Sequence, residues 1–247
     1  MKNKLIISLD VPNLRTAERL VDELSPLVEI FKVGSQLFTA TGPKIIDLLH
    51  KRKKEVFLDL KFHDIPHTVA EAARAATRLG VFMFNVHGIG GLKMMQAAAK
   101  ATEEEAEKLK IKKPLILGVT LLTSFNEQML KETGVTKQID DYVLYLAQEI
   151  KKAGLDGVVA SAQELRFLRE NLGEGFIMVT PGIRLQAPRY TNEKQDDQRR
   201  VATPAEAIKN GADYIVVGRP IITAESPKEA AEQLISSVRS ETSDKAL

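Results

Sequence analysis

The chain has no cysteine among its 247 residues. This absence excludes disulfide bonds, thiolate catalysis and metal sites built on cysteine. The sequence also lacks any apolar run near the roughly 20 residues that a membrane-spanning helix needs. Its first strand-like segment begins at Leu5, and no signal-peptide pattern precedes it. We therefore expect a cytoplasmic protein that has no membrane partner.

An excess of charge of one sign is also lacking. The 35 basic and 33 acidic residues leave a formal net charge of +2, which does not indicate a nucleic-acid partner. The 44% of hydrophobic and 28% of charged residues are typical of globular proteins and exclude disordered, collagenous and coiled-coil chains. The length fits one α/β barrel of about 250 residues. We expect a single domain over residues 1–247, with a frayed tail over 240–247.

Short apolar segments rich in β-branched residues recur along the chain, and a helix-like segment follows each. Such nearly continuous hydrophobicity is typical of parallel strands buried on both faces. Thr68–Leu79, which Gly80 ends, and Ala205–Asn210, which Gly211 ends, show the helical pattern between strands. Eight units of about 31 residues favour a closed (β/α)8 TIM barrel over an open sheet. The predicted strands are Leu5–Asp10, Ile30–Gly34, Val56–Lys61, Phe82–His87, Leu115–Leu122, Gly157–Ser161, Ile177–Thr180 and Tyr214–Gly218.

Charged residues interrupt the apolar strands near their ends. Asp59 and Lys61 close the third strand, and strand alternation puts both on one face, opposite Leu58 and Leu60. Leucines suit the layer under the helices, so the two charged side chains should point into the barrel. Lys32 lies on the neighbouring strand, about 5 Å away, and can join them.

Two explanations fit these charges. A structural ion-pair network is one, but buried pairs seldom stabilise a fold more than apolar residues would. An active site is the other, because this fold places active sites at the C-terminal ends of its strands, where Asp10 also lies. Asp64 follows in an extended loop before Pro66. It either caps the next helix, for which Thr68 is the better candidate, or reaches the barrel of a neighbouring subunit.

A second set of residues is typical of a phosphate site. Pro181-Gly182-Ile183-Arg184 follows the seventh strand, and Gly218-Arg219 follows the eighth. In TIM barrels the loops at these two places bind phosphate through glycine amides, and arginine adds a bidentate cation. The polar stretch Leu185–Arg200 between them has the length and position of a lid.

Taken together, these motifs resemble those of orotidine 5′-phosphate decarboxylases. The matches occur in family order from residue 5 to about residue 222. The bare Asp-x-Lys-x-x-Asp pattern is shared with related sugar-phosphate enzymes, whereas the combination is specific. The matching segments are Asp59-Leu60-Lys61-Phe62-His63-Asp64-Ile65-Pro66, Phe31-Lys32-Val33-Gly34, Asn85-Val86-His87, Leu122-Thr123-Ser124, Pro181-Gly182-Ile183-Arg184, Asp197-Gln198-Arg199-Arg200 and Val217-Gly218-Arg219-Pro220.

The resemblance implies cofactor-free decarboxylation of orotidine 5′-monophosphate to UMP, the last step of de novo pyrimidine synthesis, by a homodimer with shared active sites. Lys61 would protonate C6 as CO2 leaves, and Asp59 would lie near the substrate carboxylate. Lys32 and Asp64, the latter from the other subunit, would complete the charged array. The substrate-binding residues would be Asp10 and Lys32 for the ribose hydroxyls, Thr123 and Ser124 for the pyrimidine, Arg184, Gln198, Gly218 and Arg219 for the phosphate, and in addition Thr68 and Pro181.

Three alternatives remain open. A 3-keto-gulonate-6-phosphate decarboxylase shares the Asp-x-Lys-x-x-Asp motif but needs Mg²⁺ and carries an acidic residue where Lys32 stands. A phosphopentose epimerase needs metal-binding histidines on several strands, and the spacing of His63, His67 and His87 does not suit a metal site. A nucleotide-binding protein without chemistry would not require Lys61 between two aspartates. We therefore expect an enzyme that has no metal.

Overall fold

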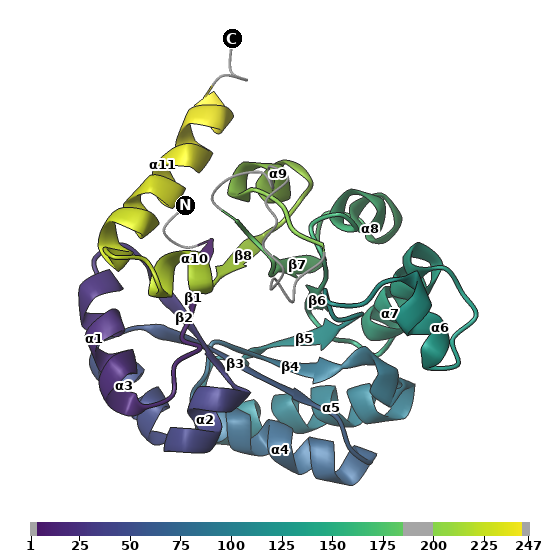
Figure 1. Cartoon of the computed structure of the whole chain (residues 1–247). Helices are drawn as coiled ribbons and strands as arrows, with labels where there is room; N and C mark the ends of the chain where they lie inside the picture. Colours follow the sequence, from purple (N-terminus) through teal and green to yellow (C-terminus); the bar gives the residue numbers. More distant parts are fainter. Residues whose placement is uncertain (1–3, 185–199, 244–247) are drawn as a thin grey trace.

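Eight parallel strands close into a barrel in the computed structural model, which describes residues 4–184 and 200–243 (Figure 1). Each strand pairs with its sequence neighbours, and β8 pairs with β1. The predicted TIM barrel is confirmed. The strands are β1 (Leu5–Ser8), β2 (Ile30–Gly34), β3 (Glu55–Phe62), β4 (Met83–His87), β5 (Leu115–Val119), β6 (Gly157–Val159), β7 (Ile177–Thr180) and β8 (Tyr214–Val217).

Helices surround the barrel and connect successive strands (Figure 1). Amphipathic segments such as α1 bury one apolar face against the strands and leave charged residues outside. The helices are α1 (Leu14–Leu24), α2 (Ser35–Thr41), α3 (Lys44–Lys51), α4 (Pro66–Arg78), η1 (Gly88–Gly90), α5 (Leu92–Leu109), α6 (Glu127–Glu132), α7 (Ile139–Lys152), α8 (Leu165–Leu172), α9 (Pro204–Lys209), α10 (Arg219–Ile222) and α11 (Pro227–Ser243).

The C-terminal helix α11 packs against α1, α9 and α10. The tail predicted to fray from residue 240 begins inside this helix, which continues to Ser243, and residues 244–247 lie outside the described part of the chain. Within residues 4–184 and 200–243, no helix has both the length and the apolar character of a membrane span.

The predicted strands are found at all eight places, although some are shorter. The largest difference is at β5, which ends at Val119 although apolar residues continue to Leu122. After the strand the chain turns, and the N–H of Phe125 donates to the Leu122 carbonyl. The apolar run therefore includes the first residues of a loop at the mouth of the barrel.

Helix α4 begins at Pro66, two residues before the predicted start. Proline suits the first helical position because it has no N–H that would remain unpaired there. The N-cap is Ile65, which provides no side-chain cap, so the expectation that Thr68 caps this helix is wrong. Gly80, with φ +68°, follows the helix as the predicted stop.

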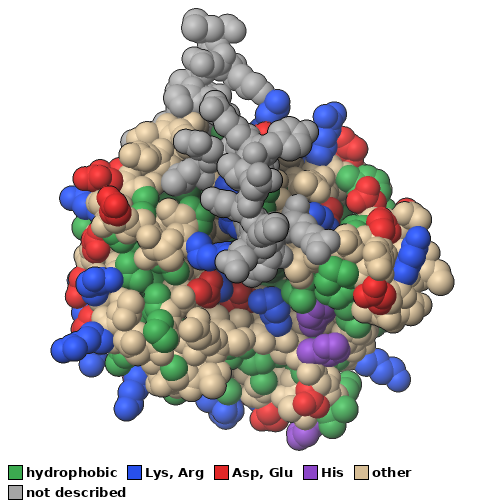
Figure 2. Space-filling model, viewed as in Figure 1, with side chains coloured by type: hydrophobic (Ala, Val, Ile, Leu, Met, Phe, Trp, Pro, Cys, Tyr) green, Lys and Arg blue, Asp and Glu red, His purple; other side chains and the backbone are tan. Residues whose placement is uncertain are grey.

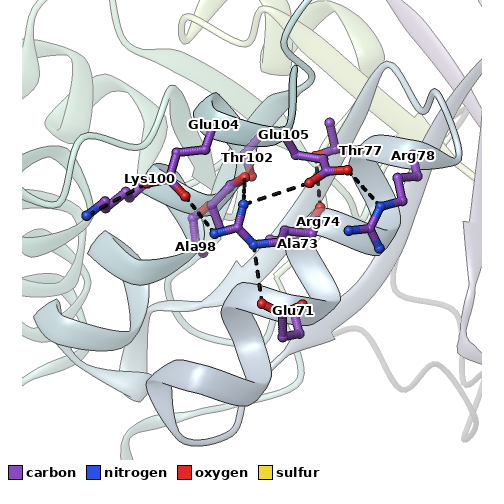
Figure 3. A network of polar contacts seen from close by, with 11 residues as sticks. Glu71, Ala73, Arg74, Thr77, Arg78, Ala98, Lys100, Thr102, Glu104 and Glu105 are labelled. Atoms are coloured by element: carbon purple, nitrogen blue, oxygen red, sulfur yellow. Dashed lines mark hydrogen bonds and ion pairs between the residues drawn. The ribbon is translucent and has the colours of Figure 1, made fainter. Parts of the chain in front are cut away.

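Helices α4 and α5 lie side by side and are joined by ion pairs (Figure 3). Arg74 of α4 contacts Glu71 at 3.2 Å and Glu104 of α5 at 2.6 Å. Arg78 contacts Glu105 of α5 at 2.7 Å. These contacts hold together the helix pair that follows β3 and β4, and the C-terminal end of β3 carries the predicted site residues Asp59 and Lys61.

Apolar side chains fill both sides of the strands. One cluster lies between the strands and the helices and includes Leu58, as predicted. A second apolar layer fills the barrel interior, with one buried residue from each of seven strands. Its members are Ile6, Ile30, Phe57, Met83, Leu117, Val179 and Val216. This layer closes the N-terminal part of the interior, so polar side chains enter the barrel only beyond it.

Candidate active site at the barrel mouth

Polar residues occupy the next inward positions on the first four strands. Each lies two residues after a member of the inner apolar layer: Ser8 on β1, Lys32 on β2, Asp59 on β3 and Asn85 on β4. Because residues two apart on a strand share a face, their side chains point into the barrel. Burying four polar side chains requires that they satisfy one another.

Four charged side chains form a continuous row from the segment after β1 across β2 and β3. Lys32 Nζ lies 3.2 Å from Asp10 Oδ1 and 3.1 Å from Asp59 Oδ2. Lys61 Nζ lies 2.7 Å from Asp59 Oδ1. Figure 2 shows acidic and basic side chains close together near the centre of this face, beside histidines. The structure thus brings the predicted charges together, with signs that alternate along the row.

The neighbouring charges control the ionisation of this row. Burial alone would raise the pKa of the Asp59 carboxyl, but Lys32 and Lys61 lower it to about 2. Burial would lower the pKa of Lys32, but Asp59 and Asp10 raise it above its usual value. The Lys61 side chain is 37% exposed and that of Lys32 only 11%. Lys61 is therefore the cation that a bound molecule can reach more easily.

The backbone of Lys61 departs from the regular strand. The register between β3 and β4 shifts between Leu58 and Phe62, so that extra residues of β3 lie opposite Asn85. Lys61 has φ +50°, a left-handed conformation that costs a non-glycine residue about 1–2 kcal/mol. Its N–H donates to Asn85 Oδ1 at 2.8 Å, which replaces a bond of the strand ladder.

A cavity of about 530 Å³ opens at the C-terminal ends of the strands. The charged row forms one wall, and loops after β5, β7 and β8 form the others. The predicted site residues that line it, besides the row, are Thr123, Ser124, Pro181, Arg184, Gly218 and Arg219. The cavity is therefore lined by the alternating row of charges and by two arginines.

The loop after β7 is held by its own backbone bonds. Gly182 has φ +78°, which favours glycine. The N–H of Arg184 donates to the Ala202 carbonyl at 2.9 Å, and the N–H of Ala202 donates to the Gly182 carbonyl at 3.2 Å. Arg184 is thus presented to the cavity from a short paired segment.

The turn after β8 approaches the charged row closely. A Cβ at Gly218 would lie 3.3 Å from the Cβ of Ser8 and 3.5 Å from Asp10 Oδ2. A glycine there lets the backbone that leads to Arg219 pass beside the row without displacing it.

Two predicted residues do not line the cavity, and a third lies outside the described part of the chain. Asp64 is exposed, and its Oδ1 accepts a hydrogen bond from the Ile65 N–H at 2.6 Å. Thr68 is exposed on the first turn of α4. Neither lines the cavity. Gln198 and the rest of the predicted lid up to residue 199 lie outside the described residues.

Two histidines lie beside the charged row. The rings of His63 and His87 stack with centroids 5.5 Å apart. Burial, His63 and Lys61 lower the pKa of His87 to about 4, which keeps its imidazole neutral at neutral pH. In the part of the chain that the structure describes, no three His, Asp or Glu residues are grouped as a metal site would require.

Two features of the site were not predicted. One is Asn85, to which the sequence motifs assign no role, although it is a polar residue inside an apolar strand, as Lys32 is. The other is a buried ion pair between Arg200 and Glu164, and Arg200 also donates to the Leu122 carbonyl at 3.0 Å. These residues are distant in the sequence, so no local pattern could have indicated their contact.

Comparisons with known proteins agree with the fold and with the motifs. The model of the Orotidine 5′-phosphate decarboxylase / HUMPS family matches residues 3–234. The chain is 49% identical to an orotidine 5′-phosphate decarboxylase of Moorella thermoacetica, over 96% of this chain and 92% of that protein. One from Legionella pneumophila (strain Corby) is 47% identical, over 95% and 99% of the two chains.

Solved structures agree with these relatives. The crystal structure of orotidine 5′-phosphate decarboxylase from Lactobacillus acidophilus superposes with a TM-score of 0.82 at 34% identity. That match covers 96% of this chain and 99% of the other. The resemblance noted from the motifs is therefore confirmed over nearly the whole length, and the chain belongs to the orotidine 5′-phosphate decarboxylase / HUMPS family.

Proposed function

We propose that this protein decarboxylates orotidine 5′-monophosphate to UMP and CO2 in pyrimidine biosynthesis, without a cofactor. The observation that carries the proposal is the row Lys32–Asp59–Lys61 along one wall of a cavity that two arginines also line. The substrate has complementary chemistry, because it carries two anionic groups, a carboxylate on the pyrimidine and a phosphate on the ribose.

The substrate lies in the cavity with its phosphate toward the loops after β7 and β8. Arginine guanidinium groups bind phosphate oxygens in bidentate fashion, and backbone N–H groups of a glycine turn add further donors. The pyrimidine then lies near the loop after β5. The proposed contacts are Arg184, Gln198, Gly218 and Arg219 for the phosphate, Asp10 and Lys32 for the ribose hydroxyls, and Thr123, Ser124 and Pro181 for the pyrimidine.

Lys61 supplies the proton. The bond between C6 and the carboxylate carbon breaks, CO2 leaves, and the electron pair of that bond remains on C6. The Lys61 ammonium transfers a proton to C6, forms the new C–H bond of UMP, and regains a proton from water. A cation already held in place by Asp59 stabilises the developing negative charge without reorganisation.

Asp59 repels the carboxylate of the bound substrate and takes no part in the proton transfer. Its carboxylate stays ionised because Lys32 and Lys61 flank it. The substrate carboxylate beside it is repelled, and this repulsion is relieved as CO2 forms and its charge moves to C6. The pair Asp59 and Lys61 therefore disfavours the reactant and favours the transition state.

A homodimer completes the site in this proposal. Asp64 and Thr68 are exposed and lie four residues apart on one segment, outside the cavity of their own chain. Ile65, Ile89 and Leu122, at the ends of three neighbouring strands, are also exposed, with 66%, 47% and 38% of their surface accessible. A second copy that covers these apolar residues would bring each Asp64 to the other subunit's charged row.

The charge of the substrate is relevant to where in the cell the enzyme acts. Orotidine 5′-monophosphate carries a phosphate and a carboxylate, and such an anion does not cross a membrane unaided. The enzyme must therefore share a compartment with its substrate, and we propose that this compartment is the cytoplasm. The catalytic domain in this proposal spans residues 1–247.

The test is the loss of orotidine 5′-monophosphate absorbance when pure protein is added in excess EDTA. We expect full turnover, with UMP and CO2 formed in equal amounts, and none with Lys61→Ala. Strict dependence on Mg²⁺ would reassign the protein to the sugar-phosphate lyases. UMP binding without turnover would leave a nucleotide-binding protein.

A further inference from the structure

The structure assigns a role to Asn85: we propose that it is a positioning residue that holds both Asp59 and Lys61 in their reactive arrangement. The inference rests on the proposed decarboxylation. Asn85 lies in β4, is completely buried and does not line the cavity, so it does not touch the substrate. Its effect must pass through the residues it contacts.

The nitrogen and the oxygen of the Asn85 side-chain amide both form hydrogen bonds with residues of β3. Its Nδ2 donates to Asp59 Oδ1 at 2.7 Å, and its Oδ1 accepts from the Lys61 N–H at 2.8 Å. The orientation of the amide is not arbitrary, because a carboxylate can only accept and a backbone N–H can only donate. One side chain therefore satisfies one group from each of the two reacting residues.

The contact with Lys61 compensates for the irregular backbone. Where β3 shifts register against β4, the Lys61 N–H has lost its ladder partner, and φ at Lys61 is +50°. Without the Asn85 oxygen this part-buried N–H would be unsatisfied in the left-handed conformation. Lys61 would then move toward an extended conformation and carry its ammonium away from Asp59.

The contact with Asp59 selects the orientation of the carboxylate. Asp59 Oδ1 accepts from both Asn85 Nδ2 and Lys61 Nζ, while Oδ2 faces Lys32 Nζ at 3.1 Å. Removing the amide lets the carboxylate rotate, which changes where Lys61 points. A displacement of about 1 Å in a reacting group is enough to lower a rate by about a hundred-fold.

The test compares two variants of the full-length protein. Asn85→Leu removes both hydrogen bonds at nearly constant volume, and we expect kcat to fall about a hundred-fold or more, while the Kd for UMP changes less than about threefold. Thr102→Val is the matched control, since Thr102 is completely buried on α5 and its hydroxyl bonds the Ala98 carbonyl at 2.9 Å, remote from the site. We expect this control to lose stability but to keep its kcat.

The variant Asn85→Asp distinguishes the hydrogen bond to Asp59 from the hydrogen bond to Lys61, because the new side chain ionises with pH. The ionised side chain still accepts from Lys61 N–H but repels Asp59, whereas the protonated form donates to Asp59 as the amide does. We expect kcat relative to wild type to rise at least about tenfold as the pH falls from about 8 to 5. The charged and titratable neighbours Asp59, Lys61, Lys32, His63 and His87 are present in both proteins, so the ratio isolates residue 85.

Each outcome decides the question. The inference is overturned if Asn85→Leu keeps kcat within about threefold of wild type, or if it loses UMP affinity as much as kcat. Should Asn85→Leu fail to fold, a ratio for Asn85→Asp that does not change with pH overturns it equally. Wild-type protein that binds UMP without turnover would instead refute the proposed function, and with it the reactive arrangement that Asn85 is proposed to hold.

Discussion

Lys61 holds its ammonium 2.7 Å from Asp59 at the point where its own backbone is left-handed, with φ +50°. The ion pair and the irregular backbone are therefore one feature. A lysine on a regular strand keeps the rotational freedom of a long flexible side chain, whereas here the backbone and the carboxylate both restrict it. The Lys61 ammonium is therefore held in place before any ligand binds.

Replacing Lys61 tests the proton donor. We expect Lys61→Ala to lower kcat at least about a thousand-fold, because no other cation of the row is as accessible, while UMP still binds through its phosphate and base contacts. Single-turnover loss of substrate and calorimetric UMP binding measure the two effects. Lys100→Ala, at a lysine whose side chain is 79% exposed on α5, is the control. Near-normal turnover of Lys61→Ala would remove this residue from the mechanism.

Acid should weaken the fold through Asp59. The pKa of its carboxyl is about 2 in the folded protein and 3.8 when unperturbed. A lowered pKa contributes stability above the unperturbed value and loses it as the pH falls. This contribution is about 2 kcal/mol at neutral pH, and about 1 kcal/mol of it is lost by about pH 3.

Urea unfolding at about pH 6 and pH 3 measures this loss. We expect the stability difference between wild type and Asp59→Asn to shrink by about 1 kcal/mol at the lower pH. A difference for Asp59→Asn that is independent of pH would contradict the ionised state of this carboxyl.

Subunit mixing tests the shared site. Asp64→Ala and Lys61→Ala should each be inactive alone. In a mixed dimer one site inherits both defects and the other is intact, so random exchange should restore about a quarter of wild-type activity. Assay after co-refolding, with subunit exchange verified by mass-tagged chains, measures this recovery. No recovery despite exchange would show that Asp64 acts within its own chain.

The phosphate contacts should contribute to turnover. We expect Arg219→Ala to lower kcat/KM by about 2–4 kcal/mol and Gln198→Ala by about 1–2 kcal/mol, since one contact is charge-assisted and the other neutral. Neither should affect orotidine, which lacks the phosphate. Arg166→Ala, at an arginine whose side chain is 82% exposed on α8, is the control. An equal loss on both substrates would mean that these residues support the barrel instead.

The fold was predictable because parallel strands buried on both faces appear in a sequence as short apolar runs. The inward direction of Asp59 followed from strand alternation with Leu58, which the apolar layer under the helices confirms. The predicted start of α4 is two residues too late. The apolar residues at helical spacing indicate a start at Thr68, whereas the helix begins at Pro66, whose backbone conformation suits the first helical position. Periodicity detects the buried face of a helix but not its first turn.

Parts of the site were beyond prediction for different reasons. The left-handed backbone at Lys61 depends on a register shift between two strands, and no glycine marks it. The pairing of Arg200 with Glu164 needs the closed barrel to bring two loops together. The role proposed for Asp64 requires a second copy of the chain, and a contact between two chains cannot be predicted from a local sequence pattern.

The contact of Arg200 with Glu164 has a consequence for chimeras of this barrel. Arg200 follows β7, Glu164 follows β6, and the Leu122 carbonyl that Arg200 also bonds follows β5, so one guanidinium ties three successive loops. A buried charge that loses its partner costs about 3–5 kcal/mol. A crossover between Glu164 and Arg200 therefore keeps this contact only when one parent supplies the glutamate and the other supplies the arginine.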